Sequence, residues 1–439
     1  MRADWIDIEL GNITTINPKI KDKTKIDPNL VVQFVPMKLV DEVVDKIHLT
    51  ETRKFHEVQK KSYTYFEEKD VLFAKVTPCM ENGKVAVARN LKNGIGYGSS
   101  EFHVLRCFNG LNEKYLFFFL VQSSFRKNAQ HAMTGAVGLR RVPKNFFENY
   151  VIPFAPLPEQ RAIVEKIEKL LSDLDNGIAN LKTAKDKLNI YRQSVLKKAF
   201  EGELTKDWRE EKGYSFQTWK LIKLGEIAEI KRGKSKHRPR NDPKLFGGKY
   251  PFIQTGDVKA ACGGNIFKYT QTYNEIGLAQ SQLWPKGTLC LTIAANIADT
   301  AFLGLDACFP DSVVGIKSED NVLSLQYLNY LIQKLKVEID SKASATAQKN
   351  INVEFLNNLE IPLATIEEQN AVVEAIESRL SACDKLAEDI DQGLEKTEAL
   401  RQSILKKAFS GELLSEEELE ACRREPYWEP ADKLLGRIK

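Results

Sequence analysis

The sequence is poor in the residues that build metal and redox sites. Its seven cysteines are scattered without a C-x-x-C pair, and its five histidines are equally dispersed. This spacing argues against a disulfide framework and against a structural zinc site. No P-loop, dinucleotide-binding glycine fingerprint or H-E-x-x-H motif occurs either. We therefore expect a chain that is not catalytic, with no metal site, no catalytic residue and no cofactor of its own.

Long apolar runs are also missing. No stretch approaches the roughly 20 apolar residues that span a bilayer, and residues 1–11 lack the pattern of a signal peptide. Hydrophobic residues make up 43% and charged residues 28% of the chain, as in ordinary globular proteins. The length of 439 residues predicts two to four domains. We expect a cytoplasmic protein with reduced thiols and no membrane contact.

Charge is unevenly distributed along the chain. Residues 1–150 hold 23 basic against 17 acidic residues, and residues 206–360 hold 21 against 17. Residues 151–205 are nearly balanced, whereas residues 361–439 hold 11 basic against 18 acidic residues. Two basic blocks thus alternate with neutral or acidic ones, which modestly favours a polyanionic partner.

The chain contains a long internal repeat. YRQSVLKKAFEGELT from Tyr191 returns as LRQSILKKAFSGELL from Leu400, and VIPFAPLPEQRAIVEKIE from Val151 returns as EIPLATIEEQNAVVEAIE from Glu360. Weaker similarity links WIDIELGNITTI with WKLIKLGEIAEI, and DVLFAKV with GTLCLTI. The order is A, B, A′, B′, with similar B blocks and divergent A blocks. Two recognition domains with different specificities, carried on the same structural B blocks, would diverge in this way. Ordinary drift after duplication, in a scaffold whose A domains do nothing specific, is the alternative that stays open.

The B blocks have the pattern of long helices. Pro158 suits a first helical turn, and Thr365 with Glu368 forms a capping-box pattern. Heptad spacing indicates a coiled-coil seam, and the least wasteful packing is B against B′, antiparallel. The alternative is that each helix packs on its own domain. The predicted seam comprises Ile167, Leu174, Leu181, Leu188, Val195, Ile376, Cys383, Ile390, Thr397 and Ile404.

The predicted fold is therefore α+β, with two mixed domains, two long helices in an antiparallel coiled coil and a pseudo-twofold repeat. Strand signals such as VVQFV, YPFIQ and TLCLTIAA, followed by amphipathic helices, support mixed domains. The predicted segments are residues 1–155 (first domain), 156–205 (central helix), 206–364 (second domain), 365–412 (C-terminal helix) and 413–439 (tail).

Binding chemistry is concentrated in a basic loop, residues 231–240, which is expected to follow a strand, LGEIAEI. Seven of its ten residues are cationic or histidine: Lys231, Arg232, Lys234, Lys236, His237, Arg238 and Arg240. Such a loop suits contacts to phosphate, and an arginine that reaches a base edge can pair with guanine. A solvated charge run is the alternative interpretation, which this density of cations makes weaker.

Polar residues elsewhere in the A blocks are further candidates for DNA contact. Each could equally be an ordinary surface residue. In the first block they are Lys75, Thr77, Lys84, Arg89, Arg140 and Arg141, and in the second Thr292, Asn296, Gln348, Lys349 and Asn350. Amide and hydroxyl groups can read bases, whereas lysine and arginine often only position the backbone. His103, between Phe102 and Val104, is read as an ordinary strand residue.

Taken together, the chain resembles the specificity subunit of type I restriction-modification enzymes. The resemblance rests on IPFAPLPEQRAIV and IPLATIEEQNAVV at the helix starts, LKKAFEGEL and LKKAFSGEL at their ends, and TGDV and PADKLLGRI elsewhere. It implies two target recognition domains that read a bipartite sequence in double-stranded DNA. It also implies that the C-terminal tail returns toward the N-terminus to complete the frame.

The resemblance further implies partners and their cofactors. Two DNA methyltransferase subunits would bind along the helices and supply S-adenosylmethionine for adenine methylation. Restriction and translocation subunits would supply ATP-dependent activity with Mg²⁺. The alternative from a different class is a coiled-coil scaffold for protein interactions, without DNA specificity.

Overall fold

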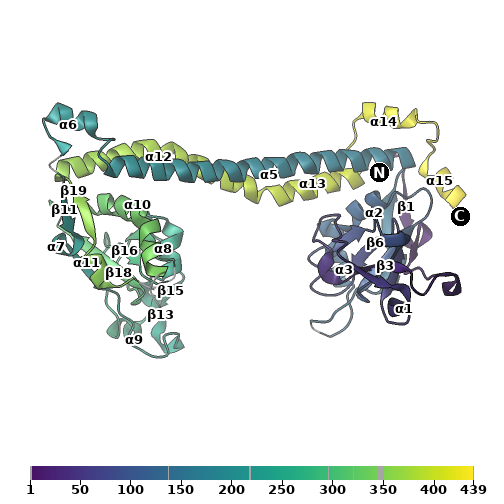
Figure 1. The fold of residues 1–439 in the computed structure, drawn as a ribbon, viewed down its shortest axis with the longest axis horizontal. Helices are drawn as coiled ribbons and strands as arrows, with labels where there is room; N and C mark the ends of the chain where they lie inside the picture. Colours follow the sequence, from purple (N-terminus) through teal and green to yellow (C-terminus); the bar gives the residue numbers. More distant parts are fainter. Residues whose placement is uncertain are drawn as a thin grey trace. The chain divides into compact units, whose positions relative to one another are not determined.

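The computed structural model describes residues 2–136, 138–216, 219–294, 296–319, 321–344 and 351–438. These residues form two compact units. Unit 1 comprises residues 1–181 and 393–439, and unit 2 comprises residues 182–392. Each unit contains one globular domain and a stretch of paired helices, so the predicted helical segments 156–205 and 365–412 are both divided between the units (Figure 1).

Unit 1 is built around two four-stranded sheets. The first has the order β2-β9-β6-β7 and is antiparallel, and the second has the order β4-β3-β8-β5 with β3 parallel to β8. A separate two-stranded ribbon pairs β1 (Ile6–Glu9) with β10 (Val151–Phe154). The strands of the two sheets are β2 (Thr14–Ile16), β3 (Val31–Val35), β4 (Glu51–Lys54), β5 (Thr64–Glu67), β6 (Val71–Ala74), β7 (Val85–Val87), β8 (Ile95–Gly98) and β9 (Phe102–Cys107).

Unit 2 repeats this plan with changes. Its main sheet has the order β12-β18-β16-β17-β14, in which β12, β18, β16 and β17 follow the same order as β2, β9, β6 and β7. A ribbon again joins the first and last strands, β11 (Lys220–Lys223) and β19 (Glu360–Leu363). The others are β12 (Ala228–Arg232), β13 (Phe246–Phe252), β14 (Asn265–Ile266), β15 (Gln271–Tyr273), β16 (Leu289–Thr292), β17 (Thr300–Leu303) and β18 (Val313–Ser318).

Two predicted elements differ from the structure. LGEIAEI is one helical turn, α7 (Leu224–Ile227), before strand β12, because Leu224 packs into the core instead of alternating along a strand. The long helical pattern after β9 is two helices, α2 (Glu113–Leu120) and α3 (Ser123–His131). Its counterpart after β18 is the single helix α10 (Leu325–Ser344). Shorter helices in the domains are α1 (Phe55–Val58), α4 (Lys144–Glu148), α8 (Thr255–Ala261), α9 (Glu275–Ala279) and α11 (Val353–Asn357).

The predicted long helices are present. α5 (Leu157–Phe200) is continuous across Gly177. The second copy is α12 (Ile366–Glu395) and α13 (Thr397–Phe409), so the expected single helix ends and restarts at Lys396. Near this break Gly393 and Thr397 have low helix propensity, and the Thr397 hydroxyl donates to the Leu394 carbonyl (2.7 Å).

Ion pairs show that the long helices run antiparallel in unit 2. In unit 2 Lys185 pairs with Asp391 and Arg192 with Asp384, both at 2.5 Å. Advancing seven residues along α5 therefore moves seven residues back along α12, which confirms the predicted antiparallel coiled coil. In unit 1 Arg401 pairs with Asp175 at 2.6 Å. With the repeat shift of 209 residues, this is the same pair as Arg192 and Asp384.

The core of each unit includes helix ends as well as the domain. In unit 1, Ile163 and Ile167 of α5 and Phe409 of α13 pack with the aromatic residues of α2. In unit 2, Leu196 of α5 and Ile376 of α12 pack with α10 and the main sheet. Ile167, Val195, Ile376 and Ile390 of the predicted seam are buried, whereas Leu174, Leu181, Leu188, Cys383, Thr397 and Ile404 are half-buried.

Candidate nucleic-acid interface

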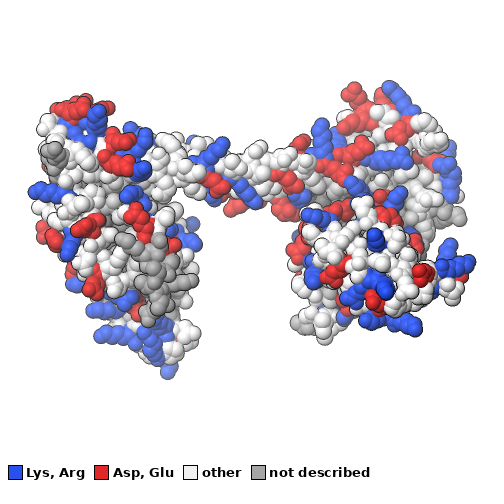
Figure 2. All heavy atoms as spheres, viewed as in Figure 1, with Lys and Arg blue, Asp and Glu red and all other residues white. Residues whose placement is uncertain are grey.

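The basic loop of unit 2 does not lie wholly after the strand as predicted, because Lys231 and Arg232 are the last two residues of β12 and pair with β18. The segment is fixed to the domain by its backbone. The Gly233 amide donates to the Val313 carbonyl (2.9 Å), and a Cβ on Gly233 would lie 2.2 Å from the Phe309 carbonyl oxygen, so only glycine fits. The His237 amide donates to Gln280, and the Ser281 hydroxyl donates to the Lys234 carbonyl. Figure 2 shows basic side chains gathered at the end of the unit that carries α9 and β13.

The cations of this loop fall into two groups. Arg240 pairs with Asp311 (2.6 Å), and the Arg238 guanidinium donates to the Ser235 and His237 carbonyls. Lys231 pairs with Glu229, and His237 contacts Asp242. Among the described residues, the side chains of Arg232, Lys234 and Lys236 form no hydrogen bond or ion pair, and all three are exposed. These three are the cations most available to a phosphate.

Four of the candidates in unit 1 lie together. The Thr77 amide donates to the Arg140 carbonyl (3.2 Å), and the Val142 amide donates to the Lys75 carbonyl (2.9 Å). Burial lowers the pKa of Lys75. Arg141 makes two 2.8 Å hydrogen bonds to Glu101, so a phosphate would compete with a carboxylate for it. The Thr77 hydroxyl is buried without a hydrogen-bond partner among the described residues.

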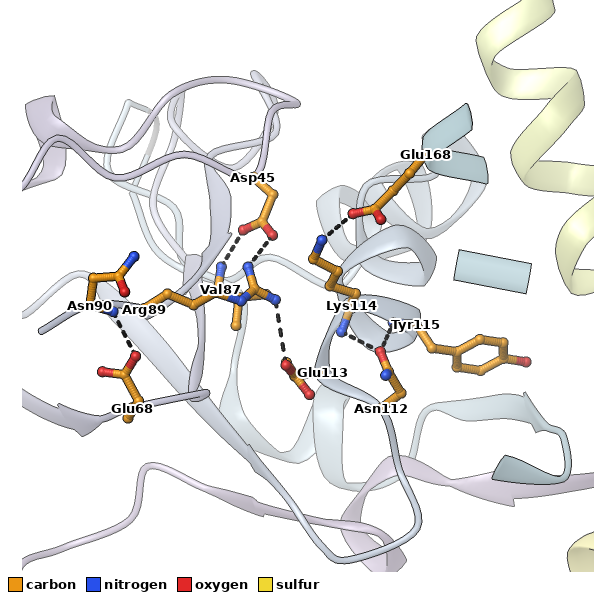
Figure 3. Close-up of polar contacts among 10 residues, drawn as sticks. All are labelled: Asp45, Glu68, Val87, Arg89, Asn90, Asn112, Glu113, Lys114, Tyr115 and Glu168. Carbon is orange, nitrogen blue, oxygen red and sulfur yellow. Dashed lines mark hydrogen bonds and ion pairs between the residues drawn. The ribbon is translucent and has the colours of Figure 1, made fainter. Parts of the chain in front are cut away.

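Lys84 and Arg89 have roles within the domain. The Lys84 ammonium donates to the Val40 carbonyl (2.9 Å). Arg89 lies between Asp45 (2.6 Å) and Glu113 (3.5 Å), as Figure 3 shows. Asp45 also accepts a hydrogen bond from the Val87 amide, so these contacts tie the end of β7 to α2. Both side chains are thus engaged in contacts within the domain.

In unit 2 the prediction for Thr292 is wrong. This residue is fully buried, and its hydroxyl interacts with the Asn296 carbonyl and accepts from the Asp299 amide (3.0 Å), so it cannot reach a base. It closes a turn after β16. Asn296 is exposed on that turn, and its side chain accepts a hydrogen bond from Lys259 (3.1 Å). Gln348, Lys349 and Asn350 lie outside the described residues.

A repeated glutamine, which the sequence interpretation missed, joins each domain to its long helix. Gln160 donates to the Gly110 and Ala155 carbonyls (3.0 and 2.8 Å) and accepts from the Asn112 amide (2.8 Å). Gln369 makes the corresponding contacts with Val322, Ala364 and Ser324 (2.9–3.0 Å). Both are fully buried. The shared E-Q pair in the two helix starts was the available signal.

The preceding glutamate of each pair anchors a different segment. Buried Glu159 accepts from the indole of Trp5 (2.7 Å) and from that of Trp428 in the C-terminal tail (3.3 Å). Buried Glu368 accepts from Arg209 (2.6 Å) and Thr205 (3.0 Å), in and beside the short helix α6 (Lys206–Lys212) that follows α5. The Thr365 hydroxyl accepts from the Glu368 amide, but the Glu368 carboxylate does not complete the expected capping box.

The C-terminal tail packs beside the N-terminus in unit 1. It contains α14 (Glu416–Arg423) and α15 (Ala431–Ile438). The Ala431 amide donates to the Asp4 carbonyl (3.1 Å), and Arg423 pairs with Asp4 (2.7 Å). The tail after α13 supplies a donor, Trp428, to Glu159, just as α6 after α5 supplies Arg209 to Glu368. The tail therefore returns to the N-terminus, as predicted.

These features define a class of protein: an internally duplicated α+β protein in which two divergent domains are carried on matching antiparallel helices. The family described as "Type I restriction modification DNA specificity domain" matches residues 2–188 and 217–396. The chain belongs to this family. Among the described residues no helix is long and apolar enough to cross a membrane.

Relatives and solved structures agree with this assignment. The chain is 42% identical over 172 residues to the type I restriction enzyme EcoAI specificity subunit of Escherichia coli, covering 39% of this chain and 28% of that one. It is 24% identical over 352 residues to a putative MjaX specificity subunit of Methanocaldococcus jannaschii, covering 78% of each chain. The fold is similar to the HsdS subunit from Thermoanaerobacter tengcongensis, with TM-score 0.61, 22% identity and coverage of 94% and 98%.

Proposed function

We propose that this chain reads DNA sequence for a type I restriction-modification complex, with each globular domain reading one half of a bipartite target. The observation that carries the proposal is the contrast within the repeat. The frame contacts of Gln160 and Gln369 are the same, whereas the exposed loops of the two domains differ. Two copies with one shared ligand would not need different surfaces. Family membership supports DNA as the ligand.

The proposed complex has other subunits that carry out the chemistry. Two DNA methyltransferase subunits would bind along the helices and bring S-adenosylmethionine, and restriction subunits would bring ATP and Mg²⁺. This chain would act without catalysis, in the cytoplasm. The repeated pair Arg192–Asp384 and Arg401–Asp175 supports two equivalent binding positions, because it presents the same helix surface once in each unit.

A domain exchange tests the proposal. Residues 13–149 would be replaced by the corresponding segment of a relative with another target, leaving β1, β10 and Gln160 in place. We expect methylome sequencing of cells that also express the methyltransferase subunit to show one changed half-site and one unchanged half-site. The matched control exchanges residues 229–358 and should change the other half-site. Methylation that is unaltered in both exchanges would favour a scaffold without DNA specificity.

A further inference from the structure

The connection between β2 and β3 in unit 1 carries a cluster of lysines that the sequence interpretation did not single out. We call residues 19–25 the lysine loop. Lys19, Lys21, Lys23 and Lys25 are all exposed. Ile20 and the residue after the loop, Ile26, pack against the small core formed by Val32, Phe34, Phe55, Val58 and Tyr97. The isoleucines thus hold the segment on the domain while the lysines face solvent.

Within this segment the lysines have little opposing charge. Its one acid, Asp22, accepts hydrogen bonds from the Thr24 amide (3.0 Å) and hydroxyl (2.6 Å) and lies 3.6 Å from Lys25. Among the described residues, the side chains of Lys19, Lys21 and Lys23 form no hydrogen bond or ion pair, and all three are exposed. Such a cluster of unpaired cations attracts a polyanion.

Further exposed lysines flank the neighbouring helix α1, which itself carries the exposed Glu57. The amides of Phe55 and His56 in α1 donate to the Leu30 and Pro28 carbonyls (2.8 and 3.0 Å), so α1 lies beside the end of this connection. Exposed Lys54 precedes α1, and exposed Lys60 and Lys61 follow it. In Figure 1 the connection projects from unit 1 in the darkest purple, and Figure 2 shows basic side chains there.

The lysine loop occupies the same place in its unit as the basic loop in unit 2. Each extends from an edge strand of one sheet, β2 or β12, and leads to the first strand of the second sheet in its unit, β3 or β13. An Asp-Pro pair with the same local cap begins two residues beyond each loop, at Asp27 and at Asp242. The Asp27 carboxylate accepts from the Asn29 amide (2.9 Å), and the Asp242 carboxylate accepts from the Lys244 amide (3.0 Å).

We propose that the lysine loop binds the phosphate backbone of double-stranded DNA beside the half-site read by the first domain, as the counterpart of the basic loop. This inference rests on the proposed function. Lysine is a compact charge on a flexible stem, whereas the planar guanidinium of arginine suits bidentate base contacts. The lysine loop therefore sets affinity and salt dependence, and other residues of the domain choose the sequence.

The test is a quadruple variant, K19Q/K21Q/K23Q/K25Q, in the full chain. Binding to a duplex with the methylome-defined target is measured over a range of salt concentrations. The slope of log affinity against log salt should become shallower by about 0.9 for each lost phosphate contact. Affinity at low salt should fall at least about threefold, and preference for the target over a duplex with one altered half-site should not change.

Two controls isolate the charge of the loop. The variant with arginine at the four positions should retain the wild-type slope. A second quadruple variant, K169Q/K182Q/K187Q/K385Q, removes exposed lysines from the long helices and should also retain it. A wild-type slope in the loop variant, with specific binding intact, overturns this inference and leaves the proposed function standing. If the wild-type chain does not prefer its target, the proposed function itself fails.

Discussion

At the scale of single residues, the position of His103 was predictable from the residues next to it in the sequence. Its place between two apolar residues predicted an ordinary strand position, and the structure confirms it in β9, 5% exposed. Nε2 lies 2.9 Å from the Val142 carbonyl oxygen, which identifies this nitrogen as the donor. Burial lowers the pKa of His103 to about 4, because protonation would place a charge inside the domain.

His103 should make folding sensitive to mild acid. Its folded pKa of about 4 lies below the ordinary 6.5, so the unfolded chain binds more protons between these values. Its contribution to stability is complete above pH about 6.5 and is lost as pH falls toward about 4, up to about 3 kcal/mol. Chemical denaturation from pH 7 to pH 4.5 should therefore show a weaker pH dependence in His103→Gln.

The matched control for this prediction is His56→Gln, since His56 is exposed. That variant should follow the wild-type pH profile. If His103→Gln also follows it, burial of His103 is not the source of the sensitivity to acid.

Other residue roles could not be derived from the sequence, because they depend on neighbours that are distant along the chain. Arg240 and Lys236 look alike in the basic loop, yet Arg240 pairs with Asp311, 71 residues away, and Lys236 is free among the described residues. Arg89 likewise pairs with a residue that is distant along the chain, Asp45. Composition identifies a basic segment but cannot tell which of its cations are already paired.

At the scale of secondary-structure elements, the repeated heptads predicted both long helices and their antiparallel packing. The break at Lys396 was not predicted, because apolar periodicity continues through it into α13. The short turn α7 was missed because four residues of helix and four of strand are hard to distinguish by periodicity. Contacts between residues that are distant along the chain were not predicted. For those of Gln160 and Gln369 the E-Q pair shared by the two helix starts was the available signal.

Each of the repeated glutamines should stabilise its own domain–helix junction. Gln160→Leu leaves the Gly110 and Ala155 carbonyls and the Asn112 amide without that partner, which should cost at least about 2 kcal/mol. Hydrogen exchange should increase in residues 110–116 and in the first turn of α5. Gln369→Leu is the matched control and should affect residues 322–328 instead. Equal exchange in both variants would contradict this local role.

At the scale of the whole molecule, the C-terminal tail completes the core of unit 1. Leu419, Cys422, Ala431 and Leu434 are buried in that core, and Trp428 shares Glu159 with Trp5. The predicted frame required such a return of the tail. The sequence could not show which residues make it, because the tail resembles the segment after α5 only in its first few residues.

Removal of residues 413–439 should therefore destabilise unit 1 selectively. The truncation removes the side chains of Leu414, Leu419 and Leu434, whose burial in the core is worth about 1.5–3 kcal/mol each, and it leaves Glu159 with one indole donor. Calorimetry should show the unfolding of unit 1 at a lower temperature, with unit 2 unchanged. Arg209→Met is the reciprocal control, because it leaves the Glu368 carboxylate without its cation in unit 2. A truncated chain that unfolds like the full chain would contradict the prediction.

The glutamine junctions have an evolutionary consequence. Among the described residues, the side-chain hydrogen bonds of Gln160 all join main-chain atoms of Gly110, Asn112 and Ala155, and those of Gln369 likewise join main-chain atoms in its own unit. Tyr115 and Tyr327 likewise donate to the main-chain carbonyls of Pro153 and Pro362. Because these hydrogen bonds join main-chain atoms of the domain, they do not depend on which side chains the domain carries at those positions. The side chains of one domain can therefore be substituted, or the domain exchanged for that of a relative, while its hydrogen bonds to the long helix are kept.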